Sequence, residues 1–190
     1  MSKKIVELAL ENAKLNNEIA NSVTGGDSYC HLMVSVSSNS IAEFVVLTRG
    51  KYPVYDVEIQ IHDLEEKTRL LMERVEKGQI SNSFIESMQL MNIASKTKKI
   101  GNIHPNVSFP FGTIQLPTNA DKKTFDIRIF ARNGTVLQSV QFRKVSGQWI
   151  WADTVSFNGR FIEKHVPPDF PLDDDSKFIW KEQMYPHPLE

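Results

Sequence analysis

The chain has one cysteine, almost no net charge and no long apolar run. With Cys30 alone, it cannot form an internal disulfide or a multi-cysteine zinc site, and we expect this residue to be a small buried side chain in a strand. A net charge of -1 gives no general attraction to nucleic acid, so no nucleic-acid partner is predicted. No stretch reaches the roughly 18 apolar residues of a membrane span, and no signal peptide is visible.

These absences lead us to expect a soluble domain that is cytoplasmic or membrane-associated. The lone cysteine fits a reducing compartment. The sequence enters a predicted helix almost at once and ends in Leu189-Glu190, which resembles a cloning remnant. We therefore expect any membrane attachment to depend on a segment outside these residues.

The length and composition are those of one folded domain with appendages. The chain has 190 residues, of which 41% are hydrophobic and 24% are charged. We divide it into an N-terminal helix at 1–24, a β-domain at 25–166 and an irregular tail at 167–190. The tail is assigned from its prolines and its run of three aspartates at 173–175, which do not suit a central strand.

The N-terminal helix, predicted from about residue 2 to residue 22, carries one regular row of side chains. This row, called the seam below, alternates spacings of three and four residues and consists of Ile5, Leu8, Asn12, Leu15 and Ile19. Such spacing is typical of a coiled coil, where asparagine at an a position specifies register and two parallel strands. At under three heptads, the helix is too short to be stable alone. Two interpretations fit: a coiled-coil segment that self-associates or binds a protein partner, or an amphipathic helix packed on its own domain.

Strands are predicted next, at 28–37, 41–48 and 54–62, followed by a helical insertion at 63–98. Asp63 and Glu66 form a capping box for a helix that runs to about residue 77, and a second helix is predicted at 83–94. The lysines at 96, 98 and 99 are interpreted as a solvated helix end. A strand at 107–116 contains Pro110 and Gly112, which suits a sheet edge or a bulge.

Three glycine turns then predict a four-stranded antiparallel meander from about residue 125 to residue 166. The turns are Asn133-Gly134, Ser146-Gly147 and Asn158-Gly159. Counting outward from them aligns one core row, which is Phe125, Phe142, Trp151 and Val166. The same count places Asp153 opposite Lys164, either as a buried ion pair on the core face or, as we favour, as an exposed pair at the sheet margin.

Together these elements predict a mainly β protein, an antiparallel β-sandwich of about eight strands with an N-terminal helix and a helical insertion. The segment 47–59 resembles the pattern of immunoglobulin-like sandwiches, in which a polar glycine turn leads into an alternating strand. Segments 24–30 and 50–57 are also similar to a family of uncharacterised bacterial proteins. That resemblance implies a membrane anchor and a short coiled coil ahead of a soluble β-domain, and it carries no catalytic residues across.

No catalytic constellation is apparent, so the main hypothesis is a non-catalytic binding or scaffolding module without a cofactor. There is no phosphate-binding loop, no nucleophile elbow and no histidine spacing typical of a metal site. One alternative is a hydrolase with a dispersed site formed by His62, His104 and Asp153. Another is a carbohydrate-binding module in which Trp149, paired with Lys144, lies exposed near a turn. The candidate ligand-binding residues are accordingly Trp149, Lys144 and His62.

Overall fold

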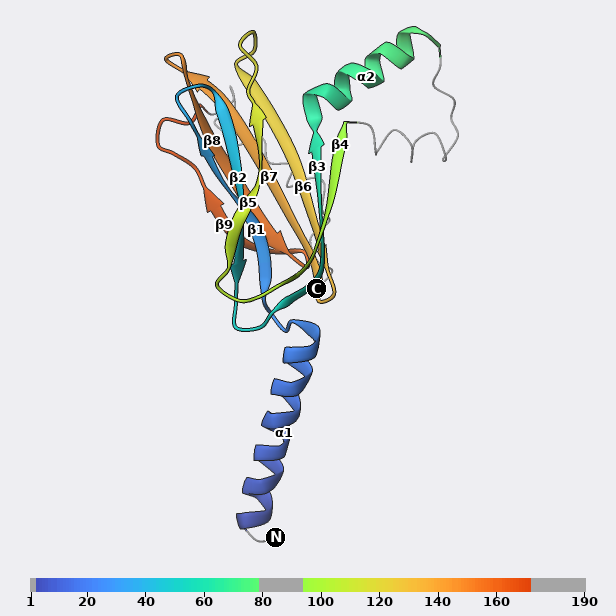
Figure 1. Cartoon of the computed structure of the whole chain (residues 1–190), viewed down its shortest axis with the longest axis vertical. Helices are drawn as coiled ribbons and strands as arrows, with labels where there is room; N and C mark the ends of the chain where they lie inside the picture. Colours follow the sequence, from blue (N-terminus) through green and yellow to red (C-terminus); the bar gives the residue numbers. More distant parts are fainter. Residues whose placement is uncertain (1–2, 79–93, 172–190) are drawn as a thin grey trace.

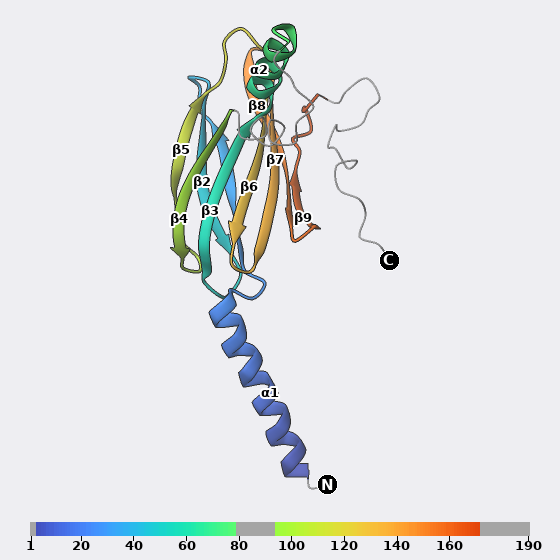
Figure 2. The same ribbon diagram turned by 90° about the vertical axis from the view of Figure 1, so that its right-hand side faces the viewer.

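A computed structural model describes residues 3–78 and 94–171. In these ranges the chain forms two helices and nine strands, in the order α1 (Lys3–Thr24), β1 (Tyr29–Val36), β2 (Ile41–Arg49), β3 (Val54–Asp63), α2 (Leu64–Glu76), β4 (Ser95–Ile103), β5 (Ser108–Gln115), β6 (Lys122–Ala131), β7 (Gly134–Val145), β8 (Gln148–Phe157) and β9 (Arg160–His165). The strands make two antiparallel sheets, ordered β1-β2-β5 and β4-β3-β6-β7-β8-β9. The sheets lie in two layers, and α1 extends away from one end of them (Figures 1 and 2). The prediction of a mainly β, antiparallel domain with an N-terminal helix is confirmed.

The core lies between the two layers and is centred on three phenylalanines. Phe44 comes from the three-stranded sheet, and Phe125 and Phe142 come from the six-stranded sheet. All three are buried, and their rings meet edge to face with centroids 6.0 to 6.4 Å apart. Each such contact adds about 0.5–1.5 kcal/mol beyond the burial of the rings. The placement of Phe125 and Phe142 in the core is therefore confirmed.

The predicted meander is present as β6 to β9, and two of its three turns form as expected. Ser146 and Gly147 both have positive φ (50° and 82°), as do Asn158 and Gly159 (50° and 77°). Positive φ at both central residues is the requirement of a type I′ hairpin turn. Around the second turn the predicted pairing of Phe142 with Trp151 is confirmed.

The first turn lies one residue earlier than predicted. Ala131 pairs with Gly134, so the loop residues are Arg132 and Asn133, and Phe125 lies opposite Val140 instead of Phe142. Gly134 is the first residue of β7, and the side chain of Asn158 occupies the place where another residue would carry its Cβ atom. The pairing register thus shifts by two residues, an even number, which leaves every side chain on its predicted face.

The pairing of β8 with β9 contains a bulge that the turn count missed. The register shifts between Val155 and Ser156, and Asp153 then lies opposite His165 instead of Lys164. A shift of one residue exchanges the faces of the strand. The predicted core row is therefore wrong at Val166, and the predicted Asp153–Lys164 pair is wrong.

The helical insertion is shorter than predicted. Asp63 caps α2 as expected, because its Oδ1 atom accepts a hydrogen bond from the backbone N–H of Glu66 at 3.0 Å. The second predicted helix, at 83–94, lies outside the described residues. Residues 95–98 belong to β4, so the insertion does not reach residue 98 and the lysines at 96, 98 and 99 are not a helix end. The strand could not be recognised from the sequence, because the exposed residues Lys96 and Lys98 stand on its core-facing side, where apolar residues would be expected.

Cys30 is buried in β1, as predicted, and burial raises the pKa of its thiol to about 12. Neither helix in the described part of the chain is long and apolar enough to span a membrane. The strand at 107–116 forms as β5, with a bulge where it pairs with β2.

Candidate functional site

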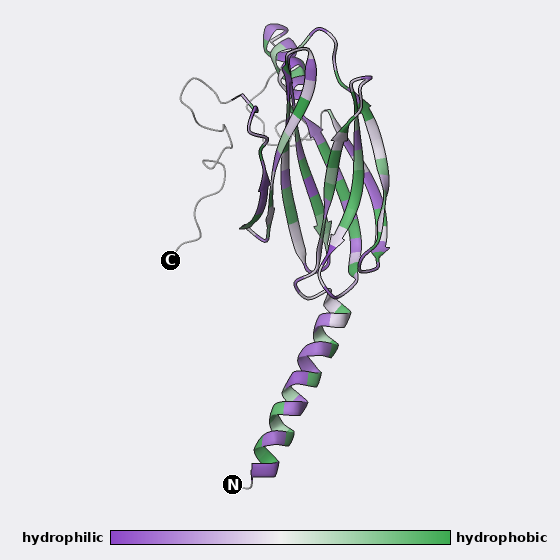
Figure 3. Ribbon diagram, turned by 90° about the vertical axis from the view of Figure 1, so that its left-hand side faces the viewer, coloured by the Kyte–Doolittle hydropathy of each residue, from purple (hydrophilic) through white to green (hydrophobic). Residues whose placement is uncertain are grey.

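The seam of α1 is fully available to a partner. Its four aliphatic members, Ile5, Leu8, Leu15 and Ile19, are between 49% and 61% exposed, and no residue of α1 is buried. Figure 3 shows apolar segments along α1 well away from the strands. Of the two interpretations of this helix, packing on its own domain is therefore wrong.

The C-terminal end of α1 is fixed to the two-layer domain. The last carbonyl groups of a helix lack partners within it, and one side chain from β3 and one from the β6–β7 turn supply partners here. The Tyr55 hydroxyl donates to the Ser22 carbonyl at 2.7 Å, and the Arg132 guanidinium donates to the Val23 carbonyl at 3.1 Å. The cation also lies at the negative end of the helix dipole, where it is favoured.

Asp56 holds the Arg132 side chain in this position. Its Oδ2 atom lies 3.0 Å from Nε and 2.8 Å from an Nη atom of Arg132, and the guanidinium lies over the Tyr55 ring at 4.8 Å. Asp56 has a φ of +56°, at an irregularity in the pairing of β3 with β4. Tyr55, Asp56 and Arg132, called the helix joint below, thus direct α1 away from the strands.

The candidate ligand residue Trp149 is not exposed, contrary to expectation. It is 7% exposed and belongs to the core, whereas Trp151, expected in the core, is half-buried. The predicted contact is present, with Lys144 Nζ 6.0 Å from the centre of the Trp149 ring. Lys144 is itself held by the connection between β5 and β6, because its Nζ donates to the Thr118 carbonyl at 3.3 Å. A buried indole presents no platform to a sugar ring.

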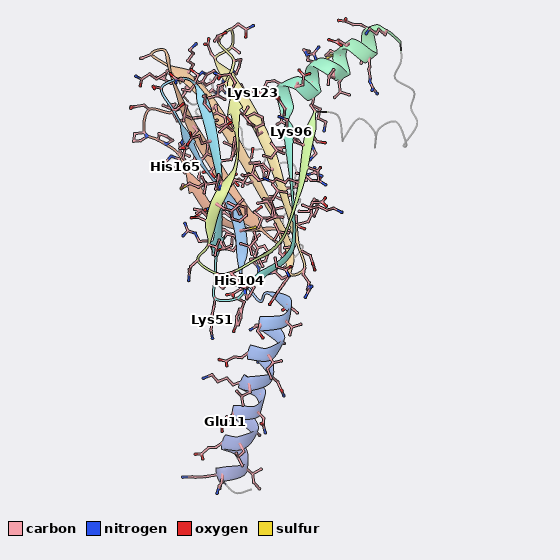
Figure 4. The ribbon with its side chains drawn as sticks, viewed as in Figure 1. Glu11, Lys51, Lys96, His104, Lys123 and His165 are labelled. Atoms are coloured by element: carbon pink, nitrogen blue, oxygen red, sulfur yellow. The ribbon has the colours of Figure 1, made fainter. Side chains whose placement is uncertain are left out.

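His62 does not meet the other residues of the predicted dispersed site. It pairs with Asp126 of β6 on one side and Ser95 of β4 on the other, whereas Asp153 lies on β8, beyond β6 and β7. His104 follows β4 at the end of the domain where α1 joins (Figure 4). Burial lowers the pKa of His62, and the nearby cations of Arg128 and Lys67 lower it further. The structure therefore does not assemble the predicted hydrolase site.

Gln138 is the centre of a buried polar cluster that the sequence reasoning missed. Its side chain is 2% exposed and projects from β7 to β1. Its Oε1 accepts from the Leu32 N–H at 2.9 Å, and its Nε2 donates to the Leu32 carbonyl at 2.7 Å. The amide thus pairs with the free edge of β1 much as a neighbouring strand would. Nε2 also donates to Asp153 Oδ2 at 2.7 Å.

Three further titratable side chains lie near Gln138 and Asp153, namely His31, Glu163 and His165. His31 Nδ1 lies 3.1 Å from Glu163 Oε1, without the alignment of a hydrogen bond. The His165 ring lies on Trp151, with 4.2 Å between the ring centroids. The polar cluster is defined here as Gln138, Asp153, His31, Glu163 and His165. It joins β1 to the β8–β9 side of the larger sheet.

Burial dominates the titration of this cluster. Burial raises the pKa of Asp153 to about 6, against the hydrogen bond from Gln138 and the charge of His165, which lower it. Burial lowers the pKa of His31, while the Glu163 carboxylate opposes that shift. Among the described residues, no group of three or more histidine, cysteine, aspartate or glutamate side chains is arranged to hold a metal ion. The cluster resembles a structural network more than a reaction centre, because the Gln138 amide at its centre is bonded to the backbone of β1 and to Asp153.

Comparisons of the chain with family models, curated proteins and solved structures found no match. Function is therefore inferred from the geometry of this chain alone. That geometry offers an exposed seam on a fixed helix.

One pH-dependent effect follows from the polar cluster. An aspartate whose folded pKa is raised contributes stability below its unfolded pKa and loses it as pH rises through the folded value. Replacing Asp153 with asparagine keeps an acceptor for Gln138 and removes the charge. As pH rises from 3.8 to about 6, the free energy of unfolding of the variant should increase relative to that of the wild type. The difference should reach up to about 3 kcal/mol at neutral pH.

Urea unfolding of both proteins across this pH range measures the effect. The difference between them is the informative quantity, because the lowered pKa of His31 makes both proteins lose stability as pH falls. Parallel stability curves would contradict the assignment of a raised pKa to Asp153.

Proposed function

We propose that the chain is a non-catalytic binding or scaffolding module of the immunoglobulin-like sandwich type, and that it self-associates through α1. The observation that carries this proposal is the exposed seam of α1, whose C-terminal end is anchored by the helix joint. Two antiparallel sheets in two layers support the sandwich assignment. The remaining hypotheses, a hydrolase and a carbohydrate-binding module, receive no comparable support from the geometry.

The composition of the seam favours a parallel pair of α1 helices. Isoleucine occupies the a positions at residues 5 and 19, and leucine occupies the d positions at residues 8 and 15. In parallel coiled coils this choice favours two strands. The remaining a position is Asn12, which in a parallel pair meets Asn12 of the second copy, so that the two amides can bond to each other. A second copy of this chain is therefore the partner that best fits the seam.

The expected affinity is low. Each aliphatic side chain of the seam is already half covered by its own helix, so complete burial contributes only about 1 kcal/mol for each side chain. Eight such side chains in a dimer contribute about 8 kcal/mol, which is comparable with the cost of association, about 4–15 kcal/mol. We expect a dissociation constant on the order of 0.1 mM or weaker.

Three variants test the proposal by sedimentation velocity over a range of protein concentrations. Replacing both Leu8 and Leu15 with aspartate should give a monomer at every concentration. Replacing Asn12 with leucine should tighten the dimer at least tenfold, because a buried asparagine amide at the seam costs stability. The matched control is Leu10→Asp, because Leu10 is 66% exposed on the opposite side of the helix and should leave association unchanged.

The proposal is wrong if the wild type stays monomeric at high concentration and Asn12→Leu stays monomeric as well. An equal effect of the Leu10 change and the seam changes would also contradict it. Circular dichroism of each variant separates loss of association from loss of the helix.

A further inference from the structure

A small pocket opens between the free edges of the two sheets, on the side away from the polar cluster. It lies between β4 and β5, each of which pairs with one neighbouring strand among the strands of residues 3–78 and 94–171. Its volume is about 220 Å³, and its apolar lining comes from Phe44, Ile61, Phe111 and Ile114. The pocket therefore reaches the phenylalanine core from the edge of the domain.

No side chain of β5 fills this pocket at position 112, because the residue there is a glycine. It pairs with Phe44, whose side chain faces the core, and residues opposite each other on antiparallel strands point to the same face. A side chain at position 112 would thus point into the pocket. A Cβ atom placed there would meet no atom within 4 Å. The missing side chain, beside the bulge in β5, leaves the space open.

Two lysines line the same pocket from β4. Lys96 pairs with Ile61 and Lys98 pairs with Ile59, so both lysines lie on the core-facing side of β4, where each is exposed at the edge of the sheet. Lys98 Nζ donates to the Phe111 carbonyl at 3.3 Å and lies 5.2 Å from the centre of the Phe111 ring. Within residues 3–78 and 94–171, neither lysine forms an ion pair with a carboxylate. Figure 4 shows Lys96 at the end of the domain far from α1.

We propose that this pocket binds a small amphiphilic anion, a medium-chain fatty carboxylate in chemical class. The apolar tail lies against Phe44, Ile61 and Ile114, and the carboxylate lies at the pocket rim between the ammonium groups of Lys96 and Lys98. An apolar lining with a few placed polar groups is the usual character of a small-molecule site. The two ammonium groups, which form no ion pair with a carboxylate among the described residues, supply the preference for an anionic head group. This site is independent of self-association through α1.

Octanoate and octanol are the probes that test the site, by calorimetry and by amide chemical-shift changes in the full chain. The two share an apolar tail and differ in the charge of the head group. Octanoate should bind at least tenfold more tightly than octanol at low salt, because a hydrogen bond to a charged group is the stronger kind. The preference should shrink as salt screens the two lysines.

Two sets of substitutions locate the site. Gly112→Leu should fill the pocket and abolish octanoate binding, while the thermal midpoint stays equal to that of the wild type or rises. The double change Lys96→Gln with Lys98→Gln should weaken octanoate about tenfold and leave octanol unaffected. Lys99→Gln is the matched control, because Lys99 pairs with Glu58 on the opposite face of the same strand and should leave both affinities unchanged.

Three results would overturn the proposal. The first is no octanoate binding by the wild type, and the second is undiminished binding by the Gly112→Leu variant. The third is protection of the β4 amides from hydrogen exchange that rises with protein concentration, which would assign this edge to strand pairing between copies instead.

Discussion

Replacing Gln138 with leucine is expected to lower the free energy of unfolding by about 4 kcal/mol. Leucine has a similar volume but cannot pair with the N–H and the carbonyl of Leu32, and each backbone group left unpaired in a buried place costs about 1–3 kcal/mol. Asp153 also loses its hydrogen bond from Gln138 Nε2. The loss is therefore larger than the modest net contribution of the hydrogen bonds themselves.

Urea unfolding at neutral pH measures this change, with Gln60→Leu as the matched control. Gln60 also lies on a central strand of the larger sheet, but its side chain bonds only to Glu58, at 3.1 Å, among the contacts that the structure gives it. The control should change stability by no more than about 0.5 kcal/mol. If both variants lose equally little, Gln138 does not join the two sheets in the way that its geometry indicates.

The same Gln138 shows where sequence reasoning stopped short. Polar residues at inward positions of a strand are the informative ones, and Gln138 lies between Val136 and Val140 on the core-facing side of β7. The parity of the strand was available from the sequence, so this residue could have been identified as a buried amide in need of partners. Its partner was not available, because Leu32 is 106 residues away and bonds through its backbone.

The turn residues supplied most of the fold prediction, but they could not reveal an irregularity within the strands. The turns at Ser146-Gly147 and Asn158-Gly159 were predicted correctly, because positive φ at both positions depends on the local sequence. The bulge at Val155 and Ser156 escaped the count, since no glycine or proline marks it in the sequence. That one-residue shift brought His165, in place of Lys164, opposite Asp153.

The seam of α1 could be predicted from the sequence, whereas the helix joint could not. The spacing of the seam is visible in the sequence, because a helical face depends only on periodicity. In the helix joint, Tyr55 and Arg132 donate to the carbonyl groups of Ser22 and Val23, which are distant in sequence. Asp56 in turn pairs with Arg132. No local sequence pattern predicts these contacts.

Gly134→Ala is expected to lower the free energy of unfolding by about 4 kcal/mol. The new Cβ atom would overlap the Asn158 side chain, and overpacking of this kind costs about 1–3 kcal/mol. Asn158 would also have to leave its bonds to the Thr135 N–H (2.9 Å) and the Asn133 carbonyl (3.1 Å), which contribute about 1 kcal/mol each. The backbone φ of +150° at Gly134 adds to the strain.

A second substitution separates the steric cause from a general intolerance of alanine. Asn158→Gly removes the side chain that the new methyl group would strike, and its φ of +50° suits glycine. Alone it should cost about 2 kcal/mol through its two lost hydrogen bonds. Combined with Gly134→Ala, it should recover most of the overpacking cost, so the two changes together should cost clearly less than their sum. Strict additivity in thermal or urea unfolding would show that the close approach of Asn158 is not what requires glycine at position 134.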